Sequence, residues 1–146
     1  MKKILFAVCA LVVLVSLSAC NCKMCSVGGG GAAVDKEGIK VIGTDELKTI
    51  VEKKSALIFD ARSAKYDNGE RIPGATALSA ESLPDDVAKA ITGKNAAVVV
   101  YCANTKCPAS GQLAVYLKKL GYTNIMEYPE GIEGWKAAGN KVDKLD

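Results

Sequence analysis

The chain contains no histidine among its 146 residues. This absence excludes cysteine–histidine and serine–histidine catalytic pairs within the chain, and metal sites built on imidazole ligands. The chain also lacks a large excess of charge of one sign, because it has 19 lysines and arginines and 16 aspartates and glutamates. The basic residues are scattered among acidic ones without a basic stripe, so nothing indicates a nucleic-acid partner. No internal repeat is present, and the length fits one domain.

The N-terminal segment has the features of an export signal. Lys2 and Lys3 precede the apolar run 4–15, and small residues follow before Cys20. Such a run is too short to span a membrane as a mature helix, and its flanks are typical of a signal peptide at 1–19. The cysteine directly after the small residues resembles a bacterial lipobox, which implies cleavage and a lipid on Cys20. The alternative is an ordinary signal peptide with a chance cysteine.

Residues 20–37 are expected to form a lipidated, glycine-rich tether ahead of a body at 38–146. Four consecutive glycines and the lack of an apolar period are typical of a flexible linker. Cleavage removes two lysines and no acid, which leaves 17 basic against 16 acidic residues. We expect the chain in the cell envelope, anchored to the membrane through Cys20. Because Asn21 is not an aspartate, the expected place in a Gram-negative host is the periplasmic side of the outer membrane.

Two local cysteine pairs remain beyond the lipid site, Cys22 with Cys25 and Cys102 with Cys107. Disulfides persist outside the inner membrane, so either pair can be oxidised at rest. A redox-active CxxC pair normally opens a helix after a strand, whereas Cys22 and Cys25 lie in the tether. A redox or metal role and a local disulfide or inert thiols both stay open for that pair.

Strand and helix patterns alternate along the body, which predicts an α/β fold with a mainly parallel central sheet and helices on both faces. The run at 96–101 is continuous, apolar and β-branched, as in a strand covered on both faces. Thr44 is expected to cap the first helix. The other expected strands lie at 39–43, 56–62, 76–78 and 124–128. The later helices are expected from Pro84 to the residues before Gly93, at 108–121 and at 131–139.

Cys102 directly follows the expected central strand, and a helix is expected from Pro108. In open α/β sheets, sites form beyond the carboxyl ends of the strands. Backbone N–H groups between a strand and a helix, together with the helix N-terminus, form a positive pocket that favours thiolate over thiol. Lys106 can strengthen that pocket. Cys102 is therefore a candidate nucleophile that needs no histidine, and the alternative is a small buried hydrophobic residue.

Four segments in this order resemble single-domain rhodanese-like proteins over about residues 40–142. They are IFDAR at 58–62, Tyr66 with GERIPGA at 69–75, VVVYC at 98–102, and the closing segment 121–142 with its Trp. The resemblance implies a rhodanese-like three-layer fold. It also implies that Cys102 accepts a sulfane sulfur, holds it as a persulfide and passes it to a thiol or cyanide.

The same resemblance assigns the residues around the cysteine. The backbone of the loop after Cys102 is the expected cradle for the sulfur, with substrate-binding residues Ala103, Asn104, Thr105 and Lys106. Asp60 and Arg62 match charged family residues at an adjacent strand end, where substrate binding and a purely structural role both stay open. We expect no cofactor, no metal and a monomer, with a small sulfur-containing donor and a thiol acceptor as partners.

The loop departs from the family pattern. It is longer than usual and, although it carries Lys106, lacks the loop arginine, and Pro108 stands where phosphatases and arsenate reductases of this fold need an arginine. Phosphoryl chemistry is therefore rejected. Cys107 can resolve a persulfide or sulfenate on Cys102 to a disulfide, or it is an inward-facing residue at the helix start.

Three functions follow, in this order of preference. The first is a membrane-anchored sulfurtransferase, an enzyme that carries sulfur on Cys102 and takes it from thiosulfate or a polysulfide. The second is a dithiol redox protein that uses Cys102 and Cys107. The third is a non-catalytic rhodanese-like binding module.

Overall fold

The computed structural model describes residues 33–34 and 38–145, and six strands in this part form one sheet. The sheet order is β1-β2-β7-β6-β3-β5. These strands are β1 (Ala33–Val34), β2 (Lys40–Val41), β3 (Leu57–Asp60), β5 (Ala75–Ala77), β6 (Val98–Tyr101) and β7 (Ile125–Tyr128). The expected signal peptide, the lipidated Cys20 and the Cys22/Cys25 pair lie outside the described residues.

Parallel pairing dominates this sheet, as the sequence predicted. Strands β2, β7, β6, β3 and β5 pair in parallel, and only β1 runs antiparallel to its neighbour β2. Strand β1 lies within the segment assigned to the tether, so the sheet reaches further toward the N-terminus than the expected body. A second, antiparallel pair joins β4 (Glu70–Arg71) to β8 (Asp143–Lys144).

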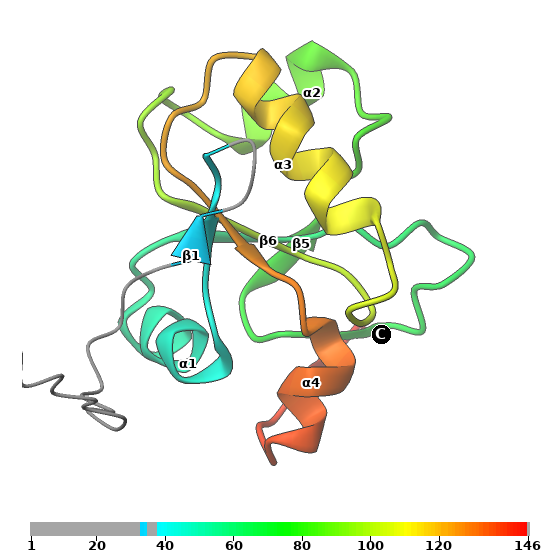
Figure 1. Ribbon diagram of the computed structural model, residues 1–146. Helices are drawn as coiled ribbons and strands as arrows, with labels where there is room; N and C mark the ends of the chain where they lie inside the picture. Colours follow the sequence, from blue (N-terminus) through cyan, green and yellow to red (C-terminus); the bar gives the residue numbers. More distant parts are fainter. Residues whose placement is uncertain (1–32, 35–37, 146) are drawn as a thin grey trace, which may run out of the picture. The chain divides into compact units, whose positions relative to one another are not determined.

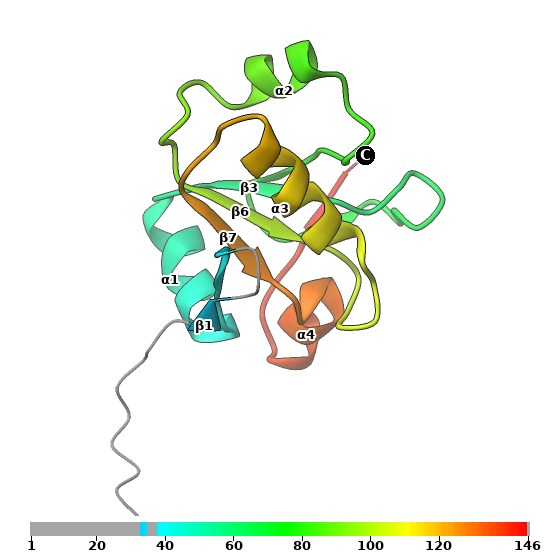
Figure 2. The ribbon, with the colours of Figure 1, turned by 45° about the horizontal axis from the view of Figure 1, so that its top comes forward.

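Helices cover both faces of the main sheet (Figures 1 and 2). On one face, α2 (Pro84–Ala90) and α3 (Ala109–Lys119) pack through Val87, Leu113 and Leu117. The other face is covered by α1 (Thr44–Lys53) and α4 (Gly131–Ala137) through Leu47, Ile50, Ile132 and Trp135. The described domain therefore has the three-layer α/β architecture that the alternation of strands and helices predicts.

Strand β6 lies at the centre of this arrangement. Val98 and Val100 belong to the core under α2 and α3, whereas Val99 and Tyr101 belong to the core under α1 and α4. All four residues are 0% exposed, which confirms the prediction of a strand covered on both faces. The strand thus holds the residue that follows it, Cys102, at a fixed point of the sheet edge.

One local prediction is wrong: Thr44 does not cap α1. Gly43 is the N-cap in an extended conformation, and Thr44 is the first helical residue. The Thr44 hydroxyl lies 2.8 Å from the Tyr128 hydroxyl and donates a hydrogen bond to Glu130 at 2.6 Å. Tertiary partners at the end of β7 and the start of α4 therefore hold the side chain that the local pattern assigned to the helix end.

In the part of the chain that the structure describes, no helix is long and apolar enough to cross a membrane.

Candidate functional site

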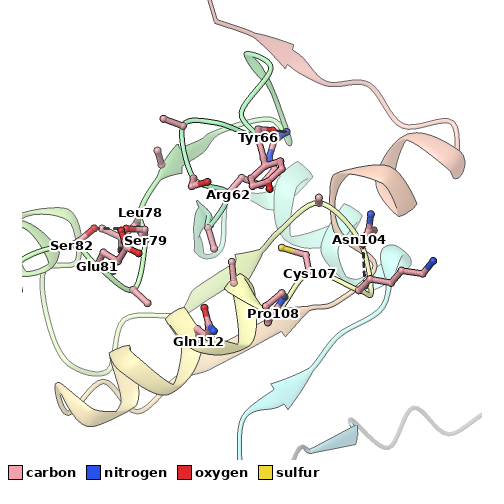
Figure 3. Close-up of a pocket in the computed structure, with 18 of the residues that line it drawn as sticks. Arg62, Tyr66, Leu78, Ser79, Glu81, Ser82, Asn104, Cys107, Pro108 and Gln112 are labelled. Carbon is pink, nitrogen blue, oxygen red and sulfur yellow. Dashed lines mark hydrogen bonds between the residues drawn. The ribbon is translucent and has the colours of Figure 1, made fainter.

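A cleft of about 850 Å³ opens at the carboxyl ends of the parallel strands β3, β5 and β6. Its walls come from the segments 61–66, 77–82 and 103–112, which follow those three strands. Figure 3 shows Cys107 between Arg62 and Tyr66 of the first segment and Pro108 and Gln112 at the start of α3. Small apolar side chains, mostly alanines, line much of it. This is the edge at which open α/β sheets form their sites.

The two cysteines of the loop form a disulfide. Cys102 is the first residue after β6, Cys107 lies directly before the N-cap of α3, and their Cα atoms are 6.3 Å apart. The spacing of five residues therefore does bring Cys107 to Cys102, as one of the two interpretations required. Cys102 is only 1% exposed, whereas Cys107 is half-buried and lines the cleft. The disulfide thus joins a buried cysteine to a half-buried one that lines the cleft.

The loop between the cysteines is folded on Asn104 in this disulfide form. The amide of Lys106 donates to the Asn104 side-chain oxygen at 3.0 Å, and the amide of Cys107 donates to the Asn104 carbonyl at 3.0 Å. Two N–H groups of the expected sulfur cradle are therefore engaged within the loop itself. A ring of amides around the sulfur remains a prediction for the reduced protein.

Helix α4 holds the other side of the loop. The amides of Ile132 and Glu133 donate to the carbonyls of Cys102 and Ala103, both at 3.0 Å. Gly131 has φ +64°, and a Cβ placed there would lie 2.5 Å from the Cys102 carbonyl oxygen and from Ala103. A glycine is needed here both for the left-handed backbone and for this close approach. The first turn of α4 thus fixes the backbone that carries the cysteine.

A buried network lies at the neighbouring strand end. Arg62 donates from Nε to both Asp60 oxygens at 3.0 Å and from Nη2 to Oδ2 at 2.7 Å, and the Tyr101 hydroxyl donates to Oδ2 at 3.0 Å. The remaining guanidinium N–H groups bond Tyr66, Asn68 and Glu70. All five donors of the guanidinium therefore have protein acceptors. This occupancy favours the structural interpretation of the Asp60–Arg62 pair over substrate binding.

The contacts in this network raise the pKa values of Arg62 and Tyr101. Burial lowers the pKa of Arg62, but the hydrogen bond to Asp60 and the Asp60 charge outweigh it and raise that pKa above its ordinary value. Burial, and after it the Asp60 charge, raises the pKa of Tyr101. The arginine is therefore cationic and the tyrosine is a neutral hydrogen-bond donor at neutral pH.

Some of the expected site residues line the cleft and others do not. Arg62, Ala103, Asn104, Lys106 and Cys107 line the cleft. Cys102 lies behind Cys107, Asp60 is 1% exposed beneath Arg62, and Thr105 is exposed outside the cleft lining.

Two features of the site escaped the sequence interpretation. Gly131 and Glu133 belong to the closing segment that carried part of the family resemblance, but no local pattern gave them a role beside the cysteine loop. The wall formed by 77–82 follows a strand of three residues, and its sequence has no feature that singles it out. A glycine as the first residue of an expected short helix was the one available signal.

The fold and the site define a class: a parallel α/β domain with a cysteine at the end of its central strand, in the loop that enters a helix. Comparison with known proteins makes the class specific. The family model described as Rhodanese-like domain matches residues 43–138, and the chain belongs to this family.

Individual relatives agree with this assignment. Thiosulfate sulfurtransferase GlpE of Pseudomonas savastanoi pv. phaseolicola is 30% identical over 92 residues, which are 63% of this chain and 83% of that protein. The structure of a rhodanese-like domain protein from Staphylococcus aureus is similar with a TM-score of 0.58 at 25% identity, over 73% of this chain and 98% of that one. The BH2092 protein of Bacillus halodurans has a TM-score of 0.63 at 22% identity, over 70% and 75% of the two chains, and supports the fold.

Proposed function

We propose that this protein is a sulfurtransferase that carries sulfane sulfur as a persulfide on Cys102. The observation that supports this most directly is the position of Cys102, at the end of the central strand β6 and at the bottom of the loop that borders the cleft. Membership in the rhodanese-like family adds to it. Thiosulfate is the proposed donor, because the relative from Pseudomonas savastanoi is described as a thiosulfate sulfurtransferase.

The proposed transfer starts from the reduced protein. The Cys102 thiolate attacks the outer sulfur of thiosulfate, a sulfur–sulfur bond forms on Cys102, and sulfite leaves with the electron pair of the broken bond. The disulfide places the Cys102 sulfur beside Cys107, at the N-terminal end of the 11-residue helix α3. The partial positive charge of that helix end favours an anion there, both the thiolate and the persulfide.

The central test replaces Cys102. Purified reduced protein is incubated with thiosulfate and cyanide, and thiocyanate is measured. We expect Cys102→Ser to lose about 10³-fold or more in rate, because the nucleophile is removed. Equal thiocyanate production by the wild-type protein and the variant, or none by the wild type, contradicts the proposal.

The redox state should control the same reaction. Because Cys102 is 1% exposed and bonded to Cys107, the oxidised protein has no free thiolate at Cys102. We expect its initial thiocyanate rate to be about 10-fold or more below that of protein reduced and then freed of reductant. Equal initial rates from the two preparations would show that a cysteine other than Cys102 carries the sulfur.

The disulfide also favours a second candidate, a dithiol redox protein that exchanges electrons through Cys102 and Cys107. This candidate needs no sulfur donor. Alkylation and mass spectrometry across a series of glutathione redox buffers measure its potential. A reversible disulfide combined with no sulfur transfer from thiosulfate favours this candidate over the sulfurtransferase.

We further propose that Cys20 carries the lipid that anchors the protein in the cell envelope. The support is the sequence pattern of residues 1–20, which lie outside the described residues. Cells expressing the chain are labelled with palmitate, and the purified protein is compared with Cys20→Ala. Loss of label in the variant supports the anchor, and unchanged labelling contradicts it.

A further inference from the structure

The two cysteines of the disulfide differ in exposure, and this difference bears on the order of the chemical steps. Cys102 is 1% exposed behind the loop, whereas the Cys107 side lines the cleft of about 850 Å³. A thiol arriving through the cleft therefore meets the Cys107 sulfur. Attack at that sulfur breaks the disulfide and releases Cys102 as a thiolate, the form that the sulfur transfer requires.

Among the described residues, the geometry also makes Cys107 the nearest thiol to any sulfur that Cys102 holds. The two Cα atoms are 6.3 Å apart in the disulfide, a separation at which two cysteines bond without backbone rearrangement. A thiol held at this distance acts as an intramolecular reactant with a high effective concentration. An acceptor from solution has to compete with it.

We propose that Cys107 is the internal acceptor that turns the Cys102 persulfide into free sulfide. The Cys107 thiolate attacks the inner, Cys102 sulfur of the persulfide, and the Cys102–Cys107 disulfide forms. The bond to the outer sulfur breaks, and that sulfur leaves as HS⁻ with the proton of the Cys107 thiol. The outer sulfur gains one electron, the Cys107 sulfur loses one, and the oxidation state of the Cys102 sulfur does not change, so no external oxidant is needed. This inference rests on the persulfide proposed above.

A thiol reductant completes the cycle. One thiolate attacks Cys107 and forms a mixed disulfide, which frees Cys102, and a second thiolate then releases Cys107. Over one cycle, thiosulfate and two thiols give sulfite, hydrogen sulfide and one organic disulfide. The structure described here is the oxidised state of that cycle. The protein would then deliver sulfide rather than a protein-bound sulfane sulfur.

A single-turnover experiment tests the step. It uses the full chain in detergent, with the four cysteines outside the described residues replaced by serine: Cys9, Cys20, Cys22 and Cys25. The chain is reduced, freed of reductant and given one equivalent of thiosulfate without added thiol. Sulfite, sulfide and the state of both cysteines are measured. We expect about one sulfide per chain together with the disulfide.

Cys107→Ser in the same background is expected to stop at the persulfide. Sulfite and a Cys102 persulfide appear, but sulfide falls about 10-fold or more until dithiothreitol is added. Equal sulfide from this variant, or a persulfide found on Cys107, overturns the internal-acceptor step alone. Absence of sulfite and persulfide from both proteins instead overturns the proposed sulfurtransferase function, and the step with it.

The order of reduction gives a second readout. The oxidised chain is mixed with glutathione for a short time, alkylated with iodoacetamide and digested. We expect glutathione on Cys107 and alkylation on Cys102, because Cys107 lines the cleft whereas Cys102 is 1% exposed and does not. Glutathione predominantly on Cys102 overturns the proposed entry of the thiol through the cleft.

Discussion

Replacing Asp60 with alanine is expected to lower the free energy of unfolding by about 3–5 kcal/mol, a large part of the total stability of a domain of this size. Asp60 is 1% exposed and accepts hydrogen bonds from Arg62 and from the Tyr101 hydroxyl. Its removal takes from the Arg62 charge, itself 8% exposed, its closest counter-ion at 2.7 Å and leaves it only the Asp67 carboxylate at 3.5 Å among the ion pairs of the described residues. It also leaves the buried Tyr101 hydroxyl without its acceptor.

Urea unfolding of the oxidised wild-type and variant proteins measures this effect. Asp86→Ala is the matched control, because Asp86 pairs with Lys89 at 3.2 Å on the surface, with side chains 56% and 78% exposed. We expect that control to change stability by about 0.5 kcal/mol or less. If Asp60→Ala also loses less than about 1 kcal/mol, the buried network is not the structural element that its contacts indicate.

The architecture was the part of the structure that the sequence predicted best. The run 96–101 is apolar at consecutive positions, and only a strand with a helical layer on each side buries such a run. Its last four residues became β6, and the flanking periodic segments became helices close to their expected bounds. Local hydrophobic patterns were sufficient here because burial on two faces leaves few alternative arrangements.

Features that depend on distant partners could not be predicted in the same way. Strands β4 and β8 are two residues long and exist because Glu70 pairs with Lys144 and Arg71 with Asp143, far apart in the chain. Thr44 had the local pattern of a cap, yet its hydroxyl contacts Tyr128 and Glu130 instead. Neither pairing leaves a periodic signal in the sequence.

The sequence offered candidate residues for the site but did not determine the oxidation state of its two cysteines. The position of Cys102 after a buried strand made it the candidate nucleophile, and the spacing to Cys107 permitted a disulfide without requiring it. Which sulfur faces the cleft depends on how the loop folds on Asn104 and against α4. That choice arises from tertiary contacts, so it became visible only in the structure.

Gly131→Ala is the second substitution with a large expected effect. We expect it to lower the free energy of unfolding by about 2–5 kcal/mol and the rate of sulfur transfer by about 10²-fold. An alanine has to adopt φ +64°, and its Cβ would lie 2.5 Å from the Cys102 carbonyl oxygen and from Ala103. Either the strained residue or the cysteine loop has to move. Movement of the loop displaces Cys102 from the end of α3.

Gly139→Ala separates these two causes. Gly139 follows the same helix and has φ +78°, but a Cβ there meets nothing within 4 Å. It should therefore show only the cost of the left-handed backbone, about 1–2 kcal/mol, and keep its sulfur-transfer rate. Urea unfolding and the thiosulfate–cyanide assay are run on both variants. Equal losses in the two would mean that backbone strain alone explains Gly131, and that its contact with the loop does not position the cysteine. A loss of activity confined to Gly131→Ala would mean that the contact of α4 with the Cys102 loop positions the cysteine for the proposed transfer.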